Sequence, residues 1–383
     1  MWESGPSSRD PNSIAFLVVA LGAILFPIWV SLATPNAGFW IGVAGDAGVF
    51  MLLALGLNVV VGFAGLLDLG YAAFFAIGAY TYAMIASGHG SATPLGTSIH
   101  APFWIVLFIA MFVAASFGVI LGAPTLRLRG DYLAIVTLGF GEIVPRVFRN
   151  AGEWTSGVNG ISALDIPEIP VIGYKILDPL AYYVIMALLI VLSVVLIRNL
   201  YHSRLGRAWM AVREDEVAAA AMGVNTVAIK LLAFAIGAAF SGFAGTYYAA
   251  KLSLVGPGNF GFSVSITVLI MVVLGGMGNI AGVMVGSLLV YYVIFIVLPG
   301  LPEAAEGLVR TIGLGVLTER SGDYPGIGEI ASRLKFLVFG LILVITMLVR
   351  PQGLLPSRER AQELKKGTHE DTIIEDVTAA VDA

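Results

Sequence analysis

Cysteine is absent from this chain, and charged residues are scarce. The 383 residues contain no Cys, which excludes a disulfide framework, a thiolate metal site and a thiol nucleophile. Only 12% of the residues are charged, whereas 58% are hydrophobic. Since a soluble domain carries roughly 25% charged residues, this chain cannot cover a water-soluble fold of its length. The apolar segments must be surrounded by lipid or by one another. The sequence therefore predicts an all-α, polytopic membrane protein.

Histidine and basic residues are also too few for several functions. The four His residues lie far apart, without metal-binding spacing. The net charge is −4 and no segment forms a basic stripe, which argues against a nucleic-acid partner. The Walker A loop for ATP needs a Gly followed directly by Lys, and the chain contains no Gly-Lys pair. An intramembrane enzyme would need a clustered nucleophile and base, or metal ligands, and the chain supplies very few such residues.

Long apolar runs predict about ten membrane-spanning helices, since a helix needs about 20 residues to cross the hydrocarbon core. The first thirteen residues lack the positive charge of a signal peptide, and the run after them is long enough to span. We therefore expect that run to be a retained first helix. The predicted spans are Ile14–Leu32, Val43–Phe63, Leu69–Ala86, Pro102–Ala123, Tyr132–Phe148, Pro179–Ile197, Leu231–Ala250, Val264–Met277, Ile280–Leu298 and Leu334–Val349.

Basic residues predict the orientation, because Lys and Arg gather in cytoplasmic loops. Here they gather at Arg127 and Arg129, in the loop 198–230 and after Val349. With ten spans, both termini and the loop 198–230 are then cytoplasmic. The expected organisation is a cytoplasmic tail at 1–13, a transmembrane domain at 14–355 with a cytoplasmic loop at 203–230 and an external loop at 299–333, and a disordered cytoplasmic tail at 356–383.

Polar groups inside the apolar segments are costly and mark functional candidates. Asp46, Asn58 and Asp68 lie along the second and third spans, and Asp68 is expected to cap the third helix. Glu142 and Arg146 are four residues apart on one helix face, so they can form an ion pair. That pair would lie either at the external end of its helix or in a solute path. Such carboxylates could also serve an ion-coupled transporter or a channel, and this alternative stays open.

The loop Ser203–Lys230 predicts a short cytoplasmic helix. Its segment REDEVAAAAMG starts with acidic residues and continues with Ala, and both features favour a helix. Gly223 supplies the stop. A rigid helix at this face can receive force from a soluble partner. The alternative is an ordinary amphipathic helix that rests on the membrane.

Six segments of the chain occur in an order that is known from one family. The loop 203–230 contains GRAWMAVREDEVAAAAMGVNTVAIK. The five other segments are ALGLNVVVGFAGLLDLGYAAFFAIGAYTYA (Ala54–Ala83), LRGDYLAIVTLGFGEIVPRVFRN (Leu128–Asn150), TSGVNGI (Thr155–Ile161), VLGGMGNIAGVMVGS (Val273–Ser287) and RPQGLL (Arg350–Leu355). Through these segments, the chain resembles the LivM-type permeases of branched-chain amino-acid ABC importers over roughly Val49–Leu355.

The resemblance implies a pore half in a bacterial or archaeal cell membrane that imports Leu, Ile or Val by alternating access. It implies a second homologous permease, two cytoplasmic ATPases that bind ATP and Mg²⁺, and an external solute-binding protein, with no cofactor in this chain. Relatives also import urea, short amides, or other amino and aromatic acids. The loop 299–333 is longer than the family pattern, and the acidic tail is extra. The residues matching the ATPase-facing motif are Arg213, Glu214, Asp215, Glu216 and Gly223. The candidates for the solute path are Asn58, Tyr71, Phe74 and Glu142.

Overall fold

The computed structural model describes residues 11–311, except 95, 97, 127–130 and 170–173, together with 330, 337, 340, 341, 344, 348 and 353–355. Several sequence predictions lie outside these described residues. They concern the start of the N-terminal tail, the basic turn with Arg127 and Arg129, most of the tenth span, most of the second half of the loop 299–333, and the tail at 356–383.

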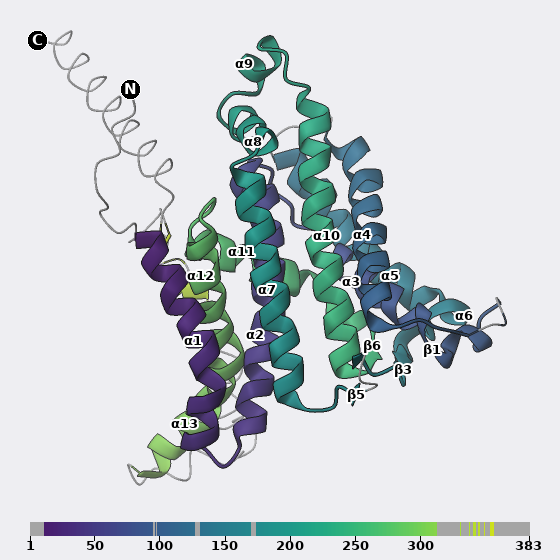
Figure 1. Cartoon of the computed structure of the whole chain (residues 1–383), viewed down its shortest axis with the longest axis vertical. Coiled ribbons are helices and arrows are strands. Elements are labelled where there is room, and N and C mark those ends of the chain that lie inside the picture. The colour runs from purple at the N-terminus through teal and green to yellow at the C-terminus, as the bar shows by residue number, and fades with distance from the viewer. Residues whose placement is uncertain are drawn as a thin grey trace, which may run out of the picture.

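Helices dominate the described part of the chain, as predicted (Figure 1). They are α1 (Pro11–Ala33), α2 (Ala37–Asn58), α3 (Ala72–Ile85), α4 (Phe103–Thr125), α5 (Asp131–Asn150), α6 (Gly152–Thr155), α7 (Pro179–Tyr201), α8 (Arg204–Glu214), α9 (Glu216–Ala221), α10 (Thr226–Leu252), α11 (Phe262–Gly275), α12 (Ile280–Tyr292) and α13 (Leu298–Thr311).

Six helical stretches of the described residues are long and apolar enough to cross a membrane, whereas the sequence predicted about ten spans for the whole chain. The six are Ala37–Phe63, Phe103–Thr125, Pro179–Tyr201, Thr226–Leu252, Pro257–Gly275 and Ile280–Ala304. The fifth predicted span does form a helix, α5, but it is not among the six. The described part is thus a multi-pass helical bundle in which not every helix is built to face lipid.

The helix α2 lies at the centre of the bundle, where α7, α10, α11, α12 and α1 pack around it. It continues directly into a π-helical turn, η1 (Val59–Phe63), whose residues are all buried. Such turns inside helices often occur at functional sites. The chain then leaves helical geometry for residues 64–71 before α3 begins.

The predicted span Leu69–Ala86 is wrong in its extent. The helix α3 starts only at Ala72 and has 14 residues, which makes it about 21 Å long. A hydrocarbon core is about 30 Å thick, so α3 alone does not cross it. Two glycines in the preceding sequence and the buried Asp68 favour the irregular segment over another helical turn. The helix α11 also has 14 residues, but the 3₁₀ turn before it extends its apolar stretch to Pro257, and it ends at a turn formed by residues 276–279.

Glycines inside the spans serve close helix packing. The helix α10 packs along α3 and α4. A Cβ on Gly242 would lie 2.8 Å from the carbonyl oxygen of Ala110, and one on Gly245 would clash with the backbone of Phe75. Small residues let helix backbones approach each other where no hydrophobic effect drives association.

The segment predicted as an external loop at 299–333 begins as a helix. A π-helical turn, η5 (Val293–Val297), joins α12 to α13, so the chain stays helical from Ile280 to Thr311. The Pro at position 302 lies inside α13.

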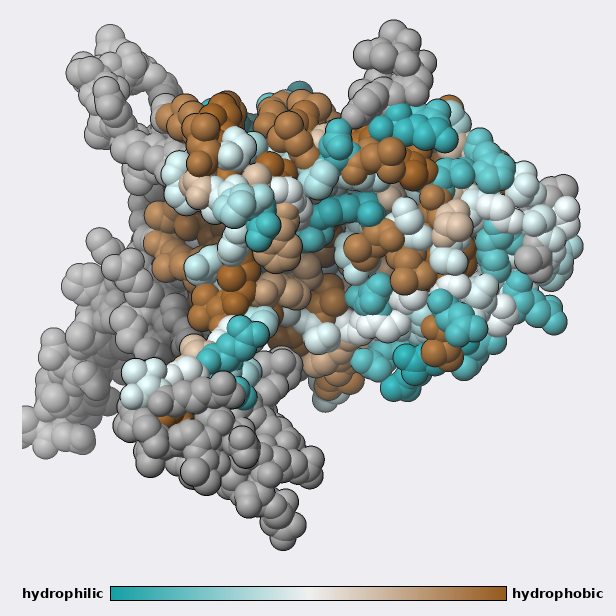
Figure 2. Space-filling view, turned by 90° about the horizontal axis from the view of Figure 1, so that it is seen from below, coloured by the Kyte–Doolittle hydropathy of each residue, from teal (hydrophilic) through white to brown (hydrophobic). Residues whose placement is uncertain are grey.

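Short strands gather at the end of the bundle opposite α8 and α9 (Figure 1). We call these two ends the strand end and the α9 end. Three antiparallel pairs of two-residue strands form there: β1 (Ala86–Ser87) with β2 (Ile99–His100), β3 (Ile161–Ser162) with β6 (Leu254–Val255), and β4 (Glu168–Ile169) with β5 (Tyr174–Lys175). Figure 2 shows that this end is largely hydrophilic on one side and hydrophobic on the other.

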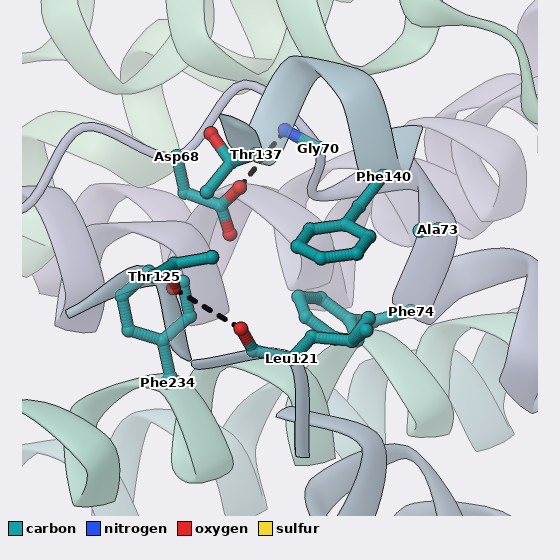
Figure 3. A pocket seen from close by; sticks show the side chains of 9 residues that line it. All are labelled: Asp68, Gly70, Ala73, Phe74, Leu121, Thr125, Thr137, Phe140 and Phe234. Carbon is teal, nitrogen blue, oxygen red and sulfur yellow. Dashed lines mark hydrogen bonds between the residues drawn. The ribbon is translucent and has the colours of Figure 1, made fainter. Parts of the chain in front are cut away.

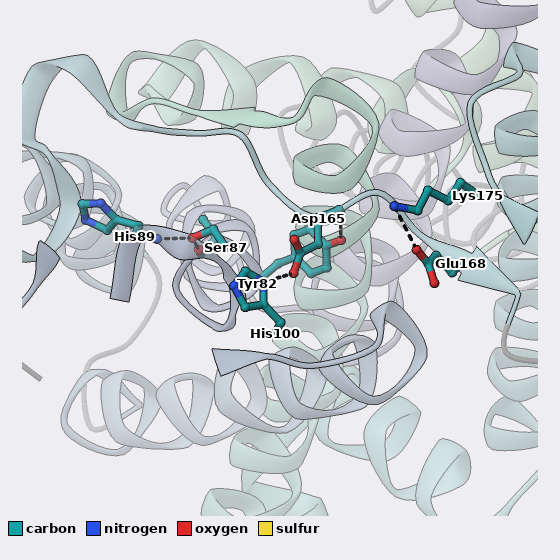
Figure 4. A network of polar contacts seen from close by, with 8 residues as sticks. Tyr82, Ser87, His89, His100, Asp165, Glu168 and Lys175 are labelled. Atoms are coloured by element: carbon teal, nitrogen blue, oxygen red, sulfur yellow. Dashed lines mark hydrogen bonds and ion pairs between the residues drawn. The ribbon is translucent and has the colours of Figure 1, made fainter. Parts of the chain in front are cut away.

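A polar network holds the strand end together (Figure 4). The His100 Nδ1 lies 2.7 Å from a carboxylate oxygen of Asp165, and the Tyr82 hydroxyl donates a 2.5 Å hydrogen bond to the backbone carbonyl of Asp165. An exposed ion pair of Lys175 and Glu168, 3.3 Å long, joins β5 to β4. These contacts connect the loop after β3 to α3 and to β2.

Candidate functional site: the α9 end and its connection to the bundle

Two short helices with side-chain caps form the α9 end. Ser203 precedes α8, and its hydroxyl accepts hydrogen bonds from the backbone N–H groups of Leu205 and Gly206. Asp215 has extended backbone geometry, and its carboxylate accepts from the N–H groups of Val217 and Ala218, at 2.8 and 2.9 Å. A capping carboxylate of this kind both ends α8 and starts α9. The predicted short helix is therefore present, with Asp215 as its cap.

Gly223 ends this helical element. Its φ angle is +83°, and nothing lies within 4 Å of the place where a Cβ would be. Only Gly adopts this left-handed conformation without strain. The stop that the sequence predicted is therefore found at Gly223, two residues after α9 ends.

The tip of the α9 end is apolar although it projects from the bundle (Figure 1). Met222 is 85% exposed and Val217 is 71% exposed, beside exposed Ala side chains of α9. Exposed large apolar residues at a projecting tip are typical of a protein contact. We call Val217, Ala218, Ala221 and Met222 the apolar tip.

Two contacts make the tip rigid with respect to the bundle. Glu216 forms a 2.7 Å ion pair with Lys230, whose side chain is only 10% exposed. The indole N–H of the buried Trp209 donates a 2.7 Å hydrogen bond to the carbonyl of Ile229. Both contacts join the α8–α9 element to the N-terminal part of α10.

Arg213 points inward, although the sequence grouped it with the acidic residues of the loop. Its guanidinium donates a hydrogen bond to the carbonyl of Gly62 in η1, and its aliphatic stem lies against Gly65. Glu214 and Asp215 are exposed beside it. The five predicted residues thus separate into Arg213, which holds the bundle, Glu216, which holds α10, and three residues at the surface.

Three of the segments that carry the family resemblance meet directly behind η1. The side-chain oxygen of Asn58 accepts a 2.9 Å hydrogen bond from the N–H of Gly278, in the turn between α11 and α12. The Asn279 amide donates to the carbonyl of Leu355, and the N–H of Leu355 donates to Gly275. We call this cluster the Asn58 junction. Its polar side chains fix backbone segments that are 76 to 220 residues apart in sequence.

The irregular segment 64–71, which leads from η1 to α3, also packs against α5. The N–H of Leu69 donates a 3.1 Å hydrogen bond to the hydroxyl of Thr137. Gly70 packs on the backbone of Thr137 so closely that a Cβ there would clash, and Gly141 approaches Gly70 in the same way. This contact between backbones gives little room for independent movement. The segment that follows η1 therefore packs tightly against α5.

Asp68 is buried in this segment and faces a small cavity (Figure 3). One carboxylate oxygen accepts a 2.8 Å hydrogen bond from the N–H of Gly70, while the other finds no partner among the described residues. The first free N–H of α3, that of Ala72, is instead capped by the hydroxyl of Ser265. The cap of α3 that the sequence expected from Asp68 is therefore supplied by Ser265 of α11. Asp68 instead accepts from the N–H of Gly70, which precedes the helix. The cavity is lined by Asp68, Gly70, Ala73, Phe74, Leu121, Thr125, Thr137, Phe140 and Phe234.

The four residues predicted for the solute path lie in different surroundings. Asn58 belongs to the Asn58 junction, and its amide nitrogen is buried without a partner among the described residues. The Tyr71 hydroxyl donates a 2.8 Å hydrogen bond to the carbonyl of Gly237. Phe74 lines the cavity beside Asp68. Glu142 pairs with Arg146 at 3.0 Å on an exposed face of α5, so the ion pair expected from their spacing is confirmed.

One charged group of the bundle had no partner assigned from sequence. Asp46, on α2, accepts a 2.6 Å hydrogen bond from the Lys251 ammonium, which also donates to the carbonyl of Gly42. Lys251 lies in the last turn of α10, one residue beyond the span predicted from hydropathy. Two residues about 200 positions apart give no local pattern. Only the unpaired Asp46 signalled that a partner had to exist.

Comparison with known proteins adds a family to this geometry. Residues 39–347 match the model of a family described as branched-chain amino acid transport system / permease component. The high-affinity branched-chain amino acid transport system permease protein LivM of Escherichia coli is 39% identical over 376 residues, covering 92% of this chain and 76% of that protein. No solved structure matches the chain significantly.

Two more distant relatives extend the similarity. The probable branched-chain amino acid transport permease protein LivM of Methanocaldococcus jannaschii is 25% identical over 336 residues, covering 81% of this chain and 91% of that protein. The permease protein LivH of the high-affinity branched-chain amino acid transport system of Salmonella typhimurium is 24% identical over 328 residues, covering 80% of this chain and 91% of that protein. The chain is thus similar both to LivM and to LivH proteins.

Proposed function

Because the chain belongs to the family of permease components of branched-chain amino acid transport systems, we propose that it is the membrane-spanning subunit of an ATP-driven importer for Leu, Ile and Val. The 39% identity to a LivM protein over 92% of the chain carries this proposal. The chain is a multi-pass membrane protein, and its work is transport across the cell membrane. The helical bundle and the projecting apolar tip support that role.

In this proposal, two cytoplasmic ATPase subunits bind ATP and Mg²⁺ and dock on the apolar tip. The chain contributes no nucleotide site and no cofactor. Met222 and Val217 would enter a groove of the ATPase, while Glu214 and Asp215 stay at the rim, where charged residues of an interface usually lie. A second, homologous permease completes the pore, and an external binding protein delivers the solute at the strand end.

The contacts of Arg213 and of the segment 64–71 suggest how force travels. Closure of the ATPase dimer on ATP pushes α9, and α8 moves with it. Arg213 passes the displacement to η1 through Gly62, and the segment 64–71 passes it to α5 through Thr137 and Gly70. Tilting of the helices then opens the solute path first to one side and then to the other. The chain itself supplies no energy in this cycle.

The proposed orientation places the α9 end in the cytoplasm and the strand end outside. It agrees with the basic residues of the loop 198–230 and with the scarcity of basic residues in the strand-end loops. Ten spans and two cytoplasmic termini complete the proposed topology.

Two alternatives differ in their consequences. A permease of the same architecture could carry urea, a short amide, or another amino or aromatic acid, since the binding protein selects much of the specificity. An ion-coupled transporter or a channel would use Asp46, Asp68 or Glu142 for the coupling ion. Such a carrier has no need of an apolar tip that projects from the membrane, and the tip therefore favours the ATP-driven importer.

Co-purification followed by ATPase assays tests the proposal. The chain is expressed with the products of its neighbouring genes, purified, and placed in proteoliposomes with the binding protein. We expect ATPase subunits to co-purify, and leucine, isoleucine and valine to stimulate ATP hydrolysis. Stimulation by urea or an aromatic acid alone would correct the substrate. If no ATPase subunit co-purifies with the chain, the proposal of an ATP-driven importer is refuted.

A further inference from the structure

Asp68 is the one carboxylate of the described residues that is almost fully buried and keeps an oxygen without a partner. Its exposed fraction is 1%. The oxygen Oδ1 accepts a hydrogen bond from the N–H of Gly70, whereas no described group bonds Oδ2. None of the ion pairs among the described residues includes Asp68. This carboxyl therefore lies in the interior without a counter-charge.

The second oxygen points into the small cavity of Figure 3. The cavity walls are mostly apolar, with three Phe rings, Leu121 and Ala73. The polar side chains that reach it are those of Asp68, Thr125 and Thr137, and Asp68 alone among the lining residues can ionise. The space open to the centre of a water molecule is about 10 Å³, close to what one water needs.

The hydroxyls in this cavity have no proton to give to Asp68. The Thr125 hydroxyl donates to carbonyls of its own helix, α4, and the Thr137 hydroxyl donates to the carbonyl of Ala134. An ionised carboxylate only accepts hydrogen bonds, whereas a protonated carboxyl carries one O–H donor. The Thr125 oxygen can still accept a bond, because a hydroxyl has two lone pairs. These surroundings therefore fit a protonated Asp68.

The charged groups of the neighbouring elements are engaged elsewhere. Arg213 of α8 donates to a carbonyl of η1, and the Tyr71 hydroxyl donates to a carbonyl of α10. On α5, Glu142 and Arg146 pair with each other at an exposed place. Lys230 of α10 forms an ion pair with α9. The helices α4 and α11 contain no ionisable residue. Burial without a counter-charge favours the neutral form of a carboxyl.

We propose that the Asp68 cavity is a proton-binding site, in which the protonated carboxyl donates to a water molecule that also bonds Thr125, and that this proton keeps the segment 64–71 seated on α5. Its effect on transport rests on the proposed function. Loss of the proton leaves a bare charge in an apolar cavity, which is costly. The segment then moves, and the contacts of Leu69 and Gly70 with α5 loosen. The proton stays on Asp68 during transport and supplies no energy.

Thermal unfolding in detergent tests the proton site without any transport assay. The unmutated chain and Asp68→Asn, whose amide is neutral and of similar shape, are compared from about pH 5 to about pH 9, above the usual range of an exposed Asp. The unfolded chain loses this proton at lower pH than the folded chain, so only the unmutated chain loses stability as pH rises. We expect the melting temperature of Asp68→Asn to gain at least about 2 °C on that of the unmutated chain over this range.

Glu168→Gln is the matched control, because Glu168 lies in an exposed ion pair and stays ionised over the whole range. Its melting temperature should keep a constant difference from that of the unmutated chain. Infrared spectroscopy of the unmutated chain with isotope-labelled Asp serves if Asp68→Asn does not fold. At about pH 6, where exposed carboxyls are ionised, we expect the C=O band of a protonated Asp, and Thr125→Val should shift it.

Transport tests the consequence of the proton. The complete complex is placed in proteoliposomes with the same pH on both sides, and leucine uptake is measured with ATP and Mg²⁺. The ratio of uptake by Asp68→Asn to uptake by the unmutated complex should rise with pH, because the protonated fraction of a carboxyl falls about tenfold per pH unit once it titrates. The pH dependence of the ATPases and the binding protein cancels in this ratio.

Three results overturn the inference. A difference in melting temperature that does not change with pH, or the lack of a protonated Asp band, would remove the proton. A gain in stability of the unmutated chain over Asp68→Asn with rising pH would show an ionised Asp68 held by a cation. Melting as expected with a constant uptake ratio would separate the proton from coupling. The lack of ATP-driven uptake at every pH would instead refute the proposed function, and the melting comparison would still decide on the proton.

Discussion

At the scale of single residues, the connection between the α9 end and the bundle depends on Arg213. Its guanidinium is the group that joins α8 to the carbonyl of Gly62. A hydrogen bond to a charged group contributes about 1.5–3 kcal/mol, enough to keep two elements in register during movement. We infer that α8 follows η1 closely as long as this contact exists.

Replacement of Arg213 by Ala is expected to reduce leucine uptake by about tenfold or more, in line with the loss of one charged hydrogen bond. The ATPases should still co-purify, because the apolar tip is unchanged. Arg207→Ala is the control: Arg207 also lies on α8, but its hydrogen bond goes to the neighbouring carbonyl of His202. Equal uptake by the two variants in proteoliposomes would show that Arg213 transmits nothing.

Gly223→Val tests the stop after α9. A β-branched residue in this left-handed conformation costs about 1–3 kcal/mol, so the tip should change its direction. We expect ATP hydrolysis to become uncoupled from uptake, while insertion into the membrane stays intact. Gly88→Val serves as the control, since Gly88 also has open space around it but no positive φ angle. Normal uptake by Gly223→Val would contradict a coupling role.

At the scale of elements, the apolar tip and the α2–α10 contact perform different tasks. The four side chains of the tip are exposed, so their replacement should affect assembly. Asp46 and Lys251 join two long helices, and their loss should affect stability. The two sets of variants therefore separate assembly from folding.

The variants Val217→Asp and Met222→Asp place a charge on the apolar tip. A charge that loses its water in an apolar interface without a partner costs several kcal/mol, so the amount of co-purified ATPase should fall by at least about tenfold. Val227→Asp, at the half-exposed start of α10, is the matched control. If all three variants retain the ATPase equally, the docking surface lies elsewhere.

Asp46→Asn leaves the Lys251 ammonium, whose side chain is only 14% exposed, without its counterion. We expect a loss of roughly 1–3 kcal/mol in the free energy of unfolding, seen as a lower melting temperature in detergent. The double variant Asp46→Asn/Lys251→Gln should recover part of this loss. Glu168→Gln breaks the exposed pair with Lys175 and should cost at most about 1 kcal/mol. A larger loss of unfolding free energy in Glu168→Gln than in Asp46→Asn would contradict this prediction.

Elements with a continuous apolar run could be predicted from sequence, whereas interrupted ones could not. Hydropathy located α4 and α7 within a few residues at their starts. It overestimated the length of α3. Residues 69–71 are apolar enough for a helix, but they leave helical geometry where Leu69 bonds to α5 and Tyr71 bonds to α10. Those contacts join residues 68 and 166 positions apart, and such distances leave no local pattern.

The candidate site was predictable to a similar extent. The short helix and the Gly stop of the α9 end are local features, so composition and spacing indicated them, whereas the capping role of Asp215 emerged from the structure. The inward direction of Arg213 was not indicated, because it depends on where η1 lies in space. Likewise, spacing predicted the Glu142–Arg146 pair, but the exposure of this side of α5 emerges only when the neighbouring helices are placed.

At the scale of the whole molecule, the described part of the chain is a bundle of long apolar helices with a projection at the α9 end, and in the proposed function the energy comes from partner ATPases. The projection connects through η1 and the segment 64–71 to α5, the one long helix described here whose outer face carries an ion pair. In the proposed mechanism, a force on α9 can thus displace α5 through these contacts. Under the proposed function, transport therefore requires an ATPase partner that acts on α9.

Uptake into liposomes of defined composition tests this most directly. Radiolabelled leucine is offered outside, with the binding protein, to vesicles holding either this chain alone or the complete complex. We predict uptake only by the complete complex with ATP and Mg²⁺ on the ATPase side. A proton or sodium gradient should give none with the chain alone. Gradient-driven uptake by the chain as the sole membrane protein would contradict the account.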